Sequence, residues 1–197
     1  MPPPTPRYEA LTTYRRDLED LPPTAGSPFE LVRGTAETLE AFHAANPKGL
    51  RPRKLEVLRS RLGTDEQTWL VRDGDGQWVG WCHTVRGSGP NSRIGHTLRL
   101  RPDEVFLFDD RTLVAHQRRG VHRFTILARM EMARRDGMTG AVTTISDSNG
   151  PSRASYGRLG FTRRSRLLHV PRLGRTVEVP AASRLLRGVA GGRRGRR

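Results

Sequence analysis

The sequence predicts a single α/β (α+β) domain with a largely antiparallel sheet and one parallel crossover. The expected order is two helices, a meander of strands, and then strand–helix–strand–helix–strand, which is typical of a sheet covered by helices. The chain has 197 residues, enough for one sizeable core and too few for a second domain of similar size. No repeat of fixed period is visible, which argues against a solenoid or a propeller.

The N-terminal third is expected to contain one short strand and two helices. Residues 8–18 have an ambiguous pattern, and residues 29–33 are typical of a strand. A helix start at Thr35 predicts a helix to about residue 45, and a second helix is expected over residues 53–61.

The middle third is expected to be a strand meander. Two β-rich stretches, residues 68–72 and 77–85, are joined by Asp73-Gly74-Asp75-Gly76, a strong hairpin signal. Residues 87–102 are polar and contain glycine, so we expect a long loop, a kind of segment that is often functional. Residues 104–114 are then typical of a strand.

The last third is expected to alternate helices and strands. Gly137 suits the end of its first helix, because glycine readily adopts the left-handed conformation found there. The expected elements are a helix over 120–136, a strand over 140–145, a helix over 152–159, and strands over 161–170 and 175–179.

The net charge of +15 leaves two interpretations open. One is attraction to a polyanion such as nucleic acid, an acidic carrier protein or a phosphorylated ligand. The other is an arginine-biased composition, since Lys48 and Lys54 are the only lysines and residues 183–197 hold six arginines and no acid. Residues 1–7, rich in proline, and 183–197 are expected to be disordered around a domain of residues 8–182.

Several classes of protein are excluded by composition. No apolar run approaches the ~20 residues that cross a bilayer, and the N-terminus lacks the layout of a signal peptide. Cys82 is the single cysteine, and the six histidines show no ligand spacing, so we expect no disulfide and no metal site. A cytoplasmic protein is expected.

Two motifs carry chemistry. The first, residues 117–122 (Gln-Arg-Arg-Gly-Val-His), lies between a strand and a helix, where backbone amides and the positive end of the helix dipole favour a phosphate. In the second, Asn149 is followed by Tyr156 after seven residues and by Gly160-Phe161 after a further four.

Together these motifs resemble the GCN5-related N-acetyltransferase (GNAT) superfamily, whose pattern is Gln/Arg-x-x-Gly-x-Gly/Ala followed by Asn-x6-Tyr-x3-Gly-Phe. The resemblance implies a mixed, mostly antiparallel sheet of about six or seven strands with a splayed parallel pair, flanked by about four helices. It also implies acetyl-CoA or another acyl-CoA as co-substrate. One position departs from the pattern: His122 stands where the family has Gly or Ala.

The resemblance implies a role for each matching position. Tyr156 would protonate the departing CoA thiolate as general acid, since a phenol is protonated at neutral pH. The pyrophosphate would bind Gln117, Arg118, Arg119, Gly120, Val121 and His122, and the pantetheine arm would bind Thr112, Leu113, Val114, Asn149, Ser152 and Ser155.

The general base is less well determined. Glu104, Asp109 and Asp110 are candidates on the strand before the turn, and Asp110 or Glu104 is preferred. Strand alternation predicts that Glu104 and Asp110 share a face with Phe106 and Phe108, with Asp109 on the other face. The alternative is that these acids pair with neighbouring arginines.

The implied activity is transfer of an acetyl or other small acyl group from CoA to an amine of a small molecule or peptide. Alternatives are an acyl carrier protein or aminoacyl-tRNA as donor, at the basic surface, or a non-catalytic relative that binds CoA or nucleic acid. No membrane partner is expected, and a homodimer is left open.

Overall fold

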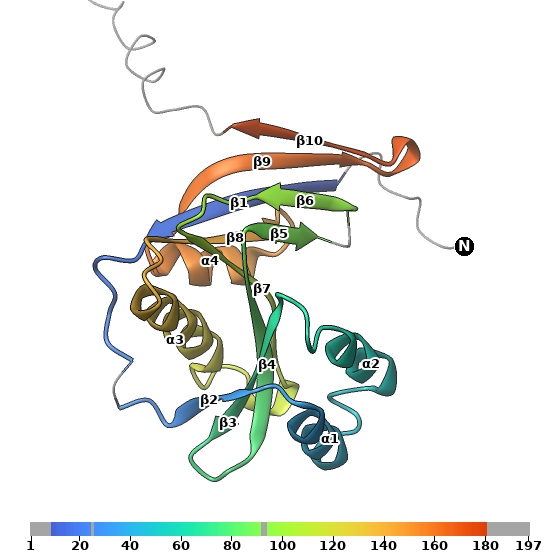
Figure 1. The fold of residues 1–197 in the computed structure, drawn as a ribbon, viewed down its shortest axis with the longest axis vertical. Coiled ribbons are helices and arrows are strands. Elements are labelled where there is room, and N and C mark those ends of the chain that lie inside the picture. Colours follow the sequence, from blue (N-terminus) through green and yellow to red (C-terminus); the bar gives the residue numbers. More distant parts are fainter. Residues whose placement is uncertain (1–8, 25, 92–93, 181–197) are drawn as a thin grey trace, which may run out of the picture.

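The computed structural model describes residues 9–24, 26–91 and 94–180. Its main sheet has eight strands in the order β10-β9-β1-β8-β7-β4-β3-β2, and β5 and β6 form a separate two-stranded ribbon (Figure 1). The strands are β1 (Glu9–Asp17), β2 (Phe29–Arg33), β3 (Gln67–Asp73), β4 (Trp78–Arg86), β5 (Ser88–Asn91), β6 (His96–Arg99), β7 (Glu104–Thr112), β8 (Gly140–Ser146), β9 (Thr162–Val170) and β10 (Arg175–Pro180). The two expected disordered segments, 1–7 and 183–197, lie outside the described residues.

The four expected helices are present. They are α1 (Ala36–Ala45), α2 (Pro52–Ser60), α3 (Val121–Arg135) and α4 (Gly150–Arg158), with short 3-10 turns at Val114–His116 and Pro171–Leu173. Thr35 caps α1, because its hydroxyl accepts from the Thr38 amide and the Thr38 hydroxyl accepts from the Thr35 amide. None of the described helices is both long and apolar enough to cross a bilayer.

One expectation was wrong, and one segment that was left ambiguous is a strand, so the main sheet has eight strands where about six or seven were expected. Residues 8–18, which were ambiguous, contain β1, which lies between β8 and β9 and is antiparallel to both. Residues 87–102, expected to be a loop, contain the ribbon β5–β6. The ring of Phe106 lies against Gly89 in this ribbon, where a side chain would collide with the ring. The ribbon therefore covers part of the sheet.

The helices lie on both faces of the sheet. Leu70 packs with α1 and α2, whereas the next residue, Val71, packs with Val121 of α3, so these helices lie on opposite faces. Neighbouring residues of β7 divide in the same way, because Phe106 packs under the ribbon and Leu107 packs against α3 and α4. One face thus carries α3 and α4, and the other carries α1, α2 and the ribbon (Figure 1).

The parallel pair β7–β8 is short. Its ladder joins Glu104–Phe106 to Gly140–Val142 and is not recorded further along the described strands. All other pairings in the main sheet are antiparallel. The expected splayed parallel pair is therefore present, and β7 and β8 separate toward their C-terminal ends, next to the start of α3.

Candidate functional site

The turn before α3 presents unpaired backbone amides. Arg118 and Gly120 have φ of 64° and 86°, and Gly120 is the N-cap of α3 without a side-chain cap. Within the described part of the chain, no acceptor is recorded for the amides of residues 118–122. Left-handed residues at a helix start turn successive N–H groups into one concavity, which binds anions such as phosphate. The geometry is that of a phosphate-binding turn.

Arginine side chains surround this turn. The Arg119 side chain is 51% exposed. Its Nη1 lies 3.0 Å from His116 Nδ1 and 3.9 Å from Asp73 Oδ2. Arg118 and Arg123 are also exposed. The turn therefore offers guanidinium groups as well as amides to an anionic ligand.

A polar cluster lies where β7 and β8 separate. Asp110 Oδ2 accepts from Arg129 Nη2 at 2.7 Å and from the Tyr156 hydroxyl at 2.9 Å. The Nε2 of His122 lies 3.5 Å from the same oxygen, and its ring meets the Tyr156 ring edge-on at 5.7 Å between centroids. Three elements, β7, α3 and α4, thus meet at one carboxylate, which we call the Asp110 cluster (Asp110, His122, Arg129 and Tyr156).

A bulge on β7 turns Asp110 toward α3 and α4. Asp109 has φ of 51°, and the pairing of β4 with β7 shifts register between Trp81 and His83. An extra residue in a strand reverses the alternation of side chains beyond it. The expectation that Glu104, Phe106, Phe108 and Asp110 share one face was therefore wrong, and so was the placing of Asp109 on the opposite face from Phe108.

Charge fixes the ionisation of the Asp110 cluster. Burial opposes the ionisation of Asp110, but Arg129 and His122 outweigh it and lower its pKa to about 2. Burial and the adjacent Asp110 raise the pKa of the Tyr156 phenol well above its ordinary value. Burial disfavours charge on Arg129, but Asp110 more than offsets this and raises its pKa. Asp110 and Arg129 are therefore charged and Tyr156 is neutral at physiological pH.

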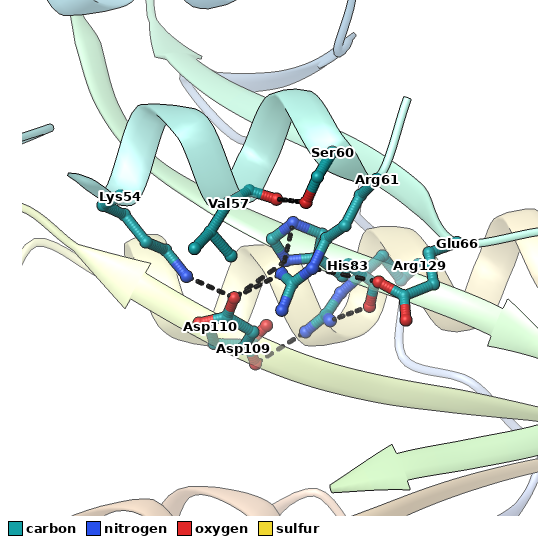
Figure 2. A network of polar contacts seen from close by, with 9 residues as sticks. All are labelled: Lys54, Val57, Ser60, Arg61, Glu66, His83, Asp109, Asp110 and Arg129. Carbon is teal, nitrogen blue, oxygen red and sulfur yellow. Dashed lines mark hydrogen bonds and ion pairs between the residues drawn. The ribbon is translucent and has the colours of Figure 1, made fainter. Parts of the chain in front are cut away.

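Asp109 is the centre of a second network on the opposite face of the sheet (Figure 2). Lys54 Nζ donates to Asp109 Oδ2 at 2.5 Å, and Arg61, just after α2, donates to the same oxygen. His83 Nδ1 lies 3.8 Å away from it. Burial opposes ionisation of Asp109, but these neighbours prevail and lower its pKa.

His83 is a neutral member of this network. Its Nε2 lies 3.0 Å from Arg61 Nη1, and because an arginine can only donate, Nε2 is the acceptor and the proton is on Nδ1, toward Asp109. The side chain is fully buried, and burial lowers its pKa to about 3. His83 thus stays neutral across the physiological range.

Glu104 lies away from the turn. It precedes Asp110 by six residues on β7, which corresponds to about 20 Å of strand. Its buried carboxylate accepts from Arg15 Nε and from Arg164 Nη1, both at 2.8 Å. Burial disfavours its charge, but the Arg101 amide and these two arginines lower its pKa. This geometry argues against Glu104 as a base, and it matches the arginine pairing held as the alternative.

The positions expected to hold a pantetheine arm flank the opening. Asn149 caps α4, its side-chain oxygen accepting from the Ser152 amide at 3.2 Å, so this oxygen is already engaged. The Leu113 amide donates to Val79 of β4 at 2.9 Å, whereas Val114 is 74% exposed.

Sequence reasoning missed Arg129, Arg61, Lys54 and His83. Arg129 carried a usable signal, because it lies among apolar residues of α3 that face the core, and its fully buried side chain also donates to the carbonyls of Thr125 and His83. Cys82 is buried, and burial raises its pKa to about 12. Within the described residues, no group of histidine, cysteine and acidic side chains is suited to hold a metal ion.

Comparison with known proteins finds similarity in structure alone. No family model matches the sequence, and no curated protein matches it. A GCN5-related N-acetyltransferase from Sphaerobacter thermophilus is 15% identical with a TM-score of 0.57, over 90% of this chain and 54% of its own. A GCN5-related N-acetyltransferase from Kribbella flavida is 16% identical with a TM-score of 0.51, over 91% and 60%.

A third structure contains a ligand. AAC(6')-Iy in complex with the bisubstrate analogue CoA-S-monomethyl-acetylneamine is 17% identical with a TM-score of 0.52, over 69% of this chain and 92% of its own. The chain spans little more than half the length of the first two structures. At these identities the likeness concerns the fold, in which the mixed sheet, the β7–β8 pair and the four helices agree.

Proposed function

We propose that this chain, which has the fold of the GCN5-related N-acetyltransferases, transfers an acetyl or other small acyl group from CoA to an amine. The observation that carries the proposal is the turn at residues 117–122. Its unpaired amides lie at the start of α3, beside the opening between β7 and β8. A phosphate site next to an opening between strands suits a ligand with a phosphorylated end and a long thin arm.

Acyl-CoA has this shape. In the proposed complex the amides of residues 118–122 and the side chains of Arg118 and Arg119 bind the pyrophosphate. The pantetheine arm follows the end of β7 at Thr112–Val114. On its other side lie Asn149, which caps α4, and Ser152 and Ser155 within that helix. AAC(6')-Iy was solved with a CoA-containing analogue, which supports a CoA thioester as donor in this fold.

The proposed reaction is direct attack of the amine on the thioester. The C–N bond forms and the C–S bond breaks, and Tyr156 donates its proton to the departing sulfur. Tyr156 is protonated and lies beside the strand opening, and its hydroxyl must turn from Asp110 to the sulfur in order to donate. Asp110 stays ionised, and its depressed pKa makes it a weak proton acceptor. We therefore propose that its role is to orient the neighbouring side chains.

The acceptor is proposed to bind on the face that carries α1, α2 and the ribbon, with its amine directed into the opening between β7 and β8. There Asp109, with a side chain 28% exposed, and Lys54 present charges of both signs beside β7 (Figure 2). An amine group pairs with a carboxylate, and a carboxylate or phosphate on the same molecule pairs with a lysine.

A panel of acyl-CoAs tests the cofactor class. A ligand present at a thousand times its Kd stabilises a protein by about 4 kcal/mol, so micromolar binding is visible in a thermal shift at millimolar ligand. Acetyl-CoA is expected to raise Tm, and thiol release is expected with at least one amine of a diverse panel. No binding of any acyl-CoA would reject the proposal.

Tyr156→Phe tests catalysis separately from binding. We expect kcat to fall on the order of 100-fold while the Kd of acetyl-CoA is retained, because a general acid acts in the transition state. Tyr14→Phe, in a buried tyrosine of β1, is the matched control. Equal kcat in the two variants would remove Tyr156 from the mechanism.

An acidic acyl carrier protein or an aminoacyl-tRNA is the second candidate donor. Four exposed arginines on or between β9 and β10 favour it: Arg163, Arg166, Arg172 and Arg175. Binding by such a surface weakens steeply with salt. If the rate with a carrier-linked or tRNA-linked donor does not change with ionic strength, these arginines do not bind the donor.

A further inference from the structure

We propose that His122 is the general base of the transfer reaction, with Asp110 as the residue that positions it. The inference rests on the proposed function and assigns the proton acceptor that the acidic side chains do not provide. It starts from the one position where the sequence departs from the GNAT motif, because a histidine there places an imidazole where the family has no side chain larger than a methyl group.

The ring of His122 lies at the opening rather than pointing away from it. Its Nε2 is 3.5 Å from Asp110 Oδ2, on β7, and its face is met by the Tyr156 ring of α4. The side chain is 31% exposed, whereas that of Asp110 is only 11% exposed. His122 therefore connects the buried carboxylate to the solvent side of the cluster.

The contact with Asp110 fixes which nitrogen can accept a proton. An ionised carboxylate only accepts, so Nε2 carries the proton and Nδ1 carries the lone pair. When Nδ1 takes up a proton, the imidazolium is stabilised by the same carboxylate, which Arg129 keeps ionised. A carboxylate that orients a histidine and stabilises its charged form is the arrangement of the Asp–His pairs in hydrolases.

The charged and titratable groups around His122 come from four elements. Asp110 faces it from β7 and Tyr156 faces it from α4, while Arg129 of α3 lies behind Asp110 at 2.7 Å. The Cys82 thiol of β4 is buried and protonated near the same carboxylate. Among these side-chain types, imidazole is the one whose ordinary chemistry allows it to accept a proton near neutral pH, which is the property that a general base needs.

Other possible bases are held by permanent donors. Asp109 is bound by Lys54 and Arg61, and its pKa is lowered. The acceptor nitrogen of His83 is occupied by Arg61 in a fully buried site. Glu104 is paired with two arginines at the other end of β7. The lone pair of His122 Nδ1 has no such partner among the described residues.

The proton balance of the reaction is complete with this assignment. The amine nitrogen forms the new C–N bond and loses one proton to His122 Nδ1. The C–S electron pair leaves with sulfur, which takes one proton from Tyr156. Afterwards the partly exposed His122 releases its proton to solvent, and Tyr156 regains one. The overall change is acyl-CoA plus amine to amide plus CoA thiol.

The test is the pH dependence of kcat/KM, with acetyl-CoA and the amine that gives the fastest thiol release in the panel. Wild type is expected to lose rate as pH falls through the range of imidazole titration, between 5 and 8. His122→Gln is expected to lose on the order of 100-fold in kcat and to lose this acid limb, with the Kd of acetyl-CoA little changed. His169→Gln, a histidine of β9 bonded to Thr176, is the matched control.

Asp110→Asn adds a readout that does not require a His122 variant to fold. Removing the negative charge takes away the group that stabilises the imidazolium, so the acid limb should move to lower pH. An unchanged profile in His122→Gln, or, if that variant does not fold, an unmoved limb in Asp110→Asn, would overturn the inference and leave the proposed function standing. Wild-type protein without acyl-CoA binding or thiol release would overturn both.

Discussion

Arg129 and Asp110 form a buried ion pair, with Arg129 Nη2 donating to Asp110 Oδ2 over 2.7 Å. The other two nitrogens of this guanidinium, Nε and Nη1, donate to the carbonyls of Thr125 and His83 at 2.9 and 2.8 Å. One side chain of α3 thus joins strands β4 and β7 beneath the candidate site. Burial of the Arg129 charge is tolerated here because each nitrogen of the guanidinium has an acceptor.

Replacement of Arg129 should therefore be costly. Arg129→Met leaves Asp110 charged, buried and without its strongest donor, and we expect the free energy of unfolding to fall by about 3–5 kcal/mol. Urea denaturation followed by circular dichroism measures this. Arg134→Met, at an exposed arginine of the same helix, should change stability little. Similar losses in both variants would show that the pair is not a special source of stability.

Asp110 should also make stability depend on pH below 4. Its pKa of about 2 lies below the ordinary 3.8, so its contribution is complete above pH 4 and is lost as pH falls toward 2. A difference of this size corresponds to about 2 kcal/mol. Urea titrations at several pH values should show a steeper loss in wild type than in Asp110→Asn, and parallel curves would contradict the depressed pKa.

Gly120 allows a separation of strain from binding. Gly120→Ala introduces a side chain at φ 86° with no neighbour within 4 Å, so the direct cost is backbone strain of about 1–2 kcal/mol. Gly137→Ala, at the other end of α3 with φ 81° and equally open space, carries the same strain. Calorimetry should show acetyl-CoA binding weakened about tenfold by the first variant alone, because the amides proposed to bind phosphate are disturbed there.

A result in which both glycine variants bind acetyl-CoA equally well would argue against phosphate binding at residues 117–122. A result in which both bind it equally poorly would indicate a general effect of unfolding rather than a local one.

Gly80 of β4 lies directly against the backbone of β7. A methyl group there would overlap the carbonyl oxygen of Arg111 on β7, and because this is backbone, the strands must shift. Gly80→Ala is expected to destabilise by about 1–3 kcal/mol. Gly157→Ala, in the exposed part of α4 with nothing within 4 Å, should instead stabilise by up to about 1 kcal/mol. Thermal denaturation measures the change in stability of each variant. A change in the same direction in Gly80→Ala and Gly157→Ala would refute the packing argument.

Elements with local signals could be predicted from the sequence. The hairpin at residues 73–76 and the cap at Thr35 depend on residues a few positions apart, and both were confirmed. Strand β1 could not be predicted, because Leu11, Thr12, Thr13 and Tyr14 are all buried in a central strand covered on both faces, which removes the alternation. The ribbon strand β5 contains Gly89 and Pro90, which are depleted in strands.

The site was predictable as a motif and not as a network. The turn at 117–122 lies between strand and helix as expected, because sequence spacing determines it. The direction of Asp110 depends on a bulge at Asp109. Aspartate adopts positive φ more often than most residues do, but the residue type alone does not place a bulge at this position. Contacts such as Arg129 with Asp110 join residues 19 apart through the packing of a helix on a sheet, which periodicity does not specify.

The place of β1 between β8 and β9 has a consequence for how the protein forms. Thr12 of β1 bonds to Asp147, 135 residues later, so the strand has no partner until most of the chain has been synthesised. Contacts between distant segments slow folding, and an unpaired strand is exposed to aggregation meanwhile. We therefore expect slow refolding that is limited by the pairing of β1 with β8 and β9. We also expect a need for chaperones at high expression levels.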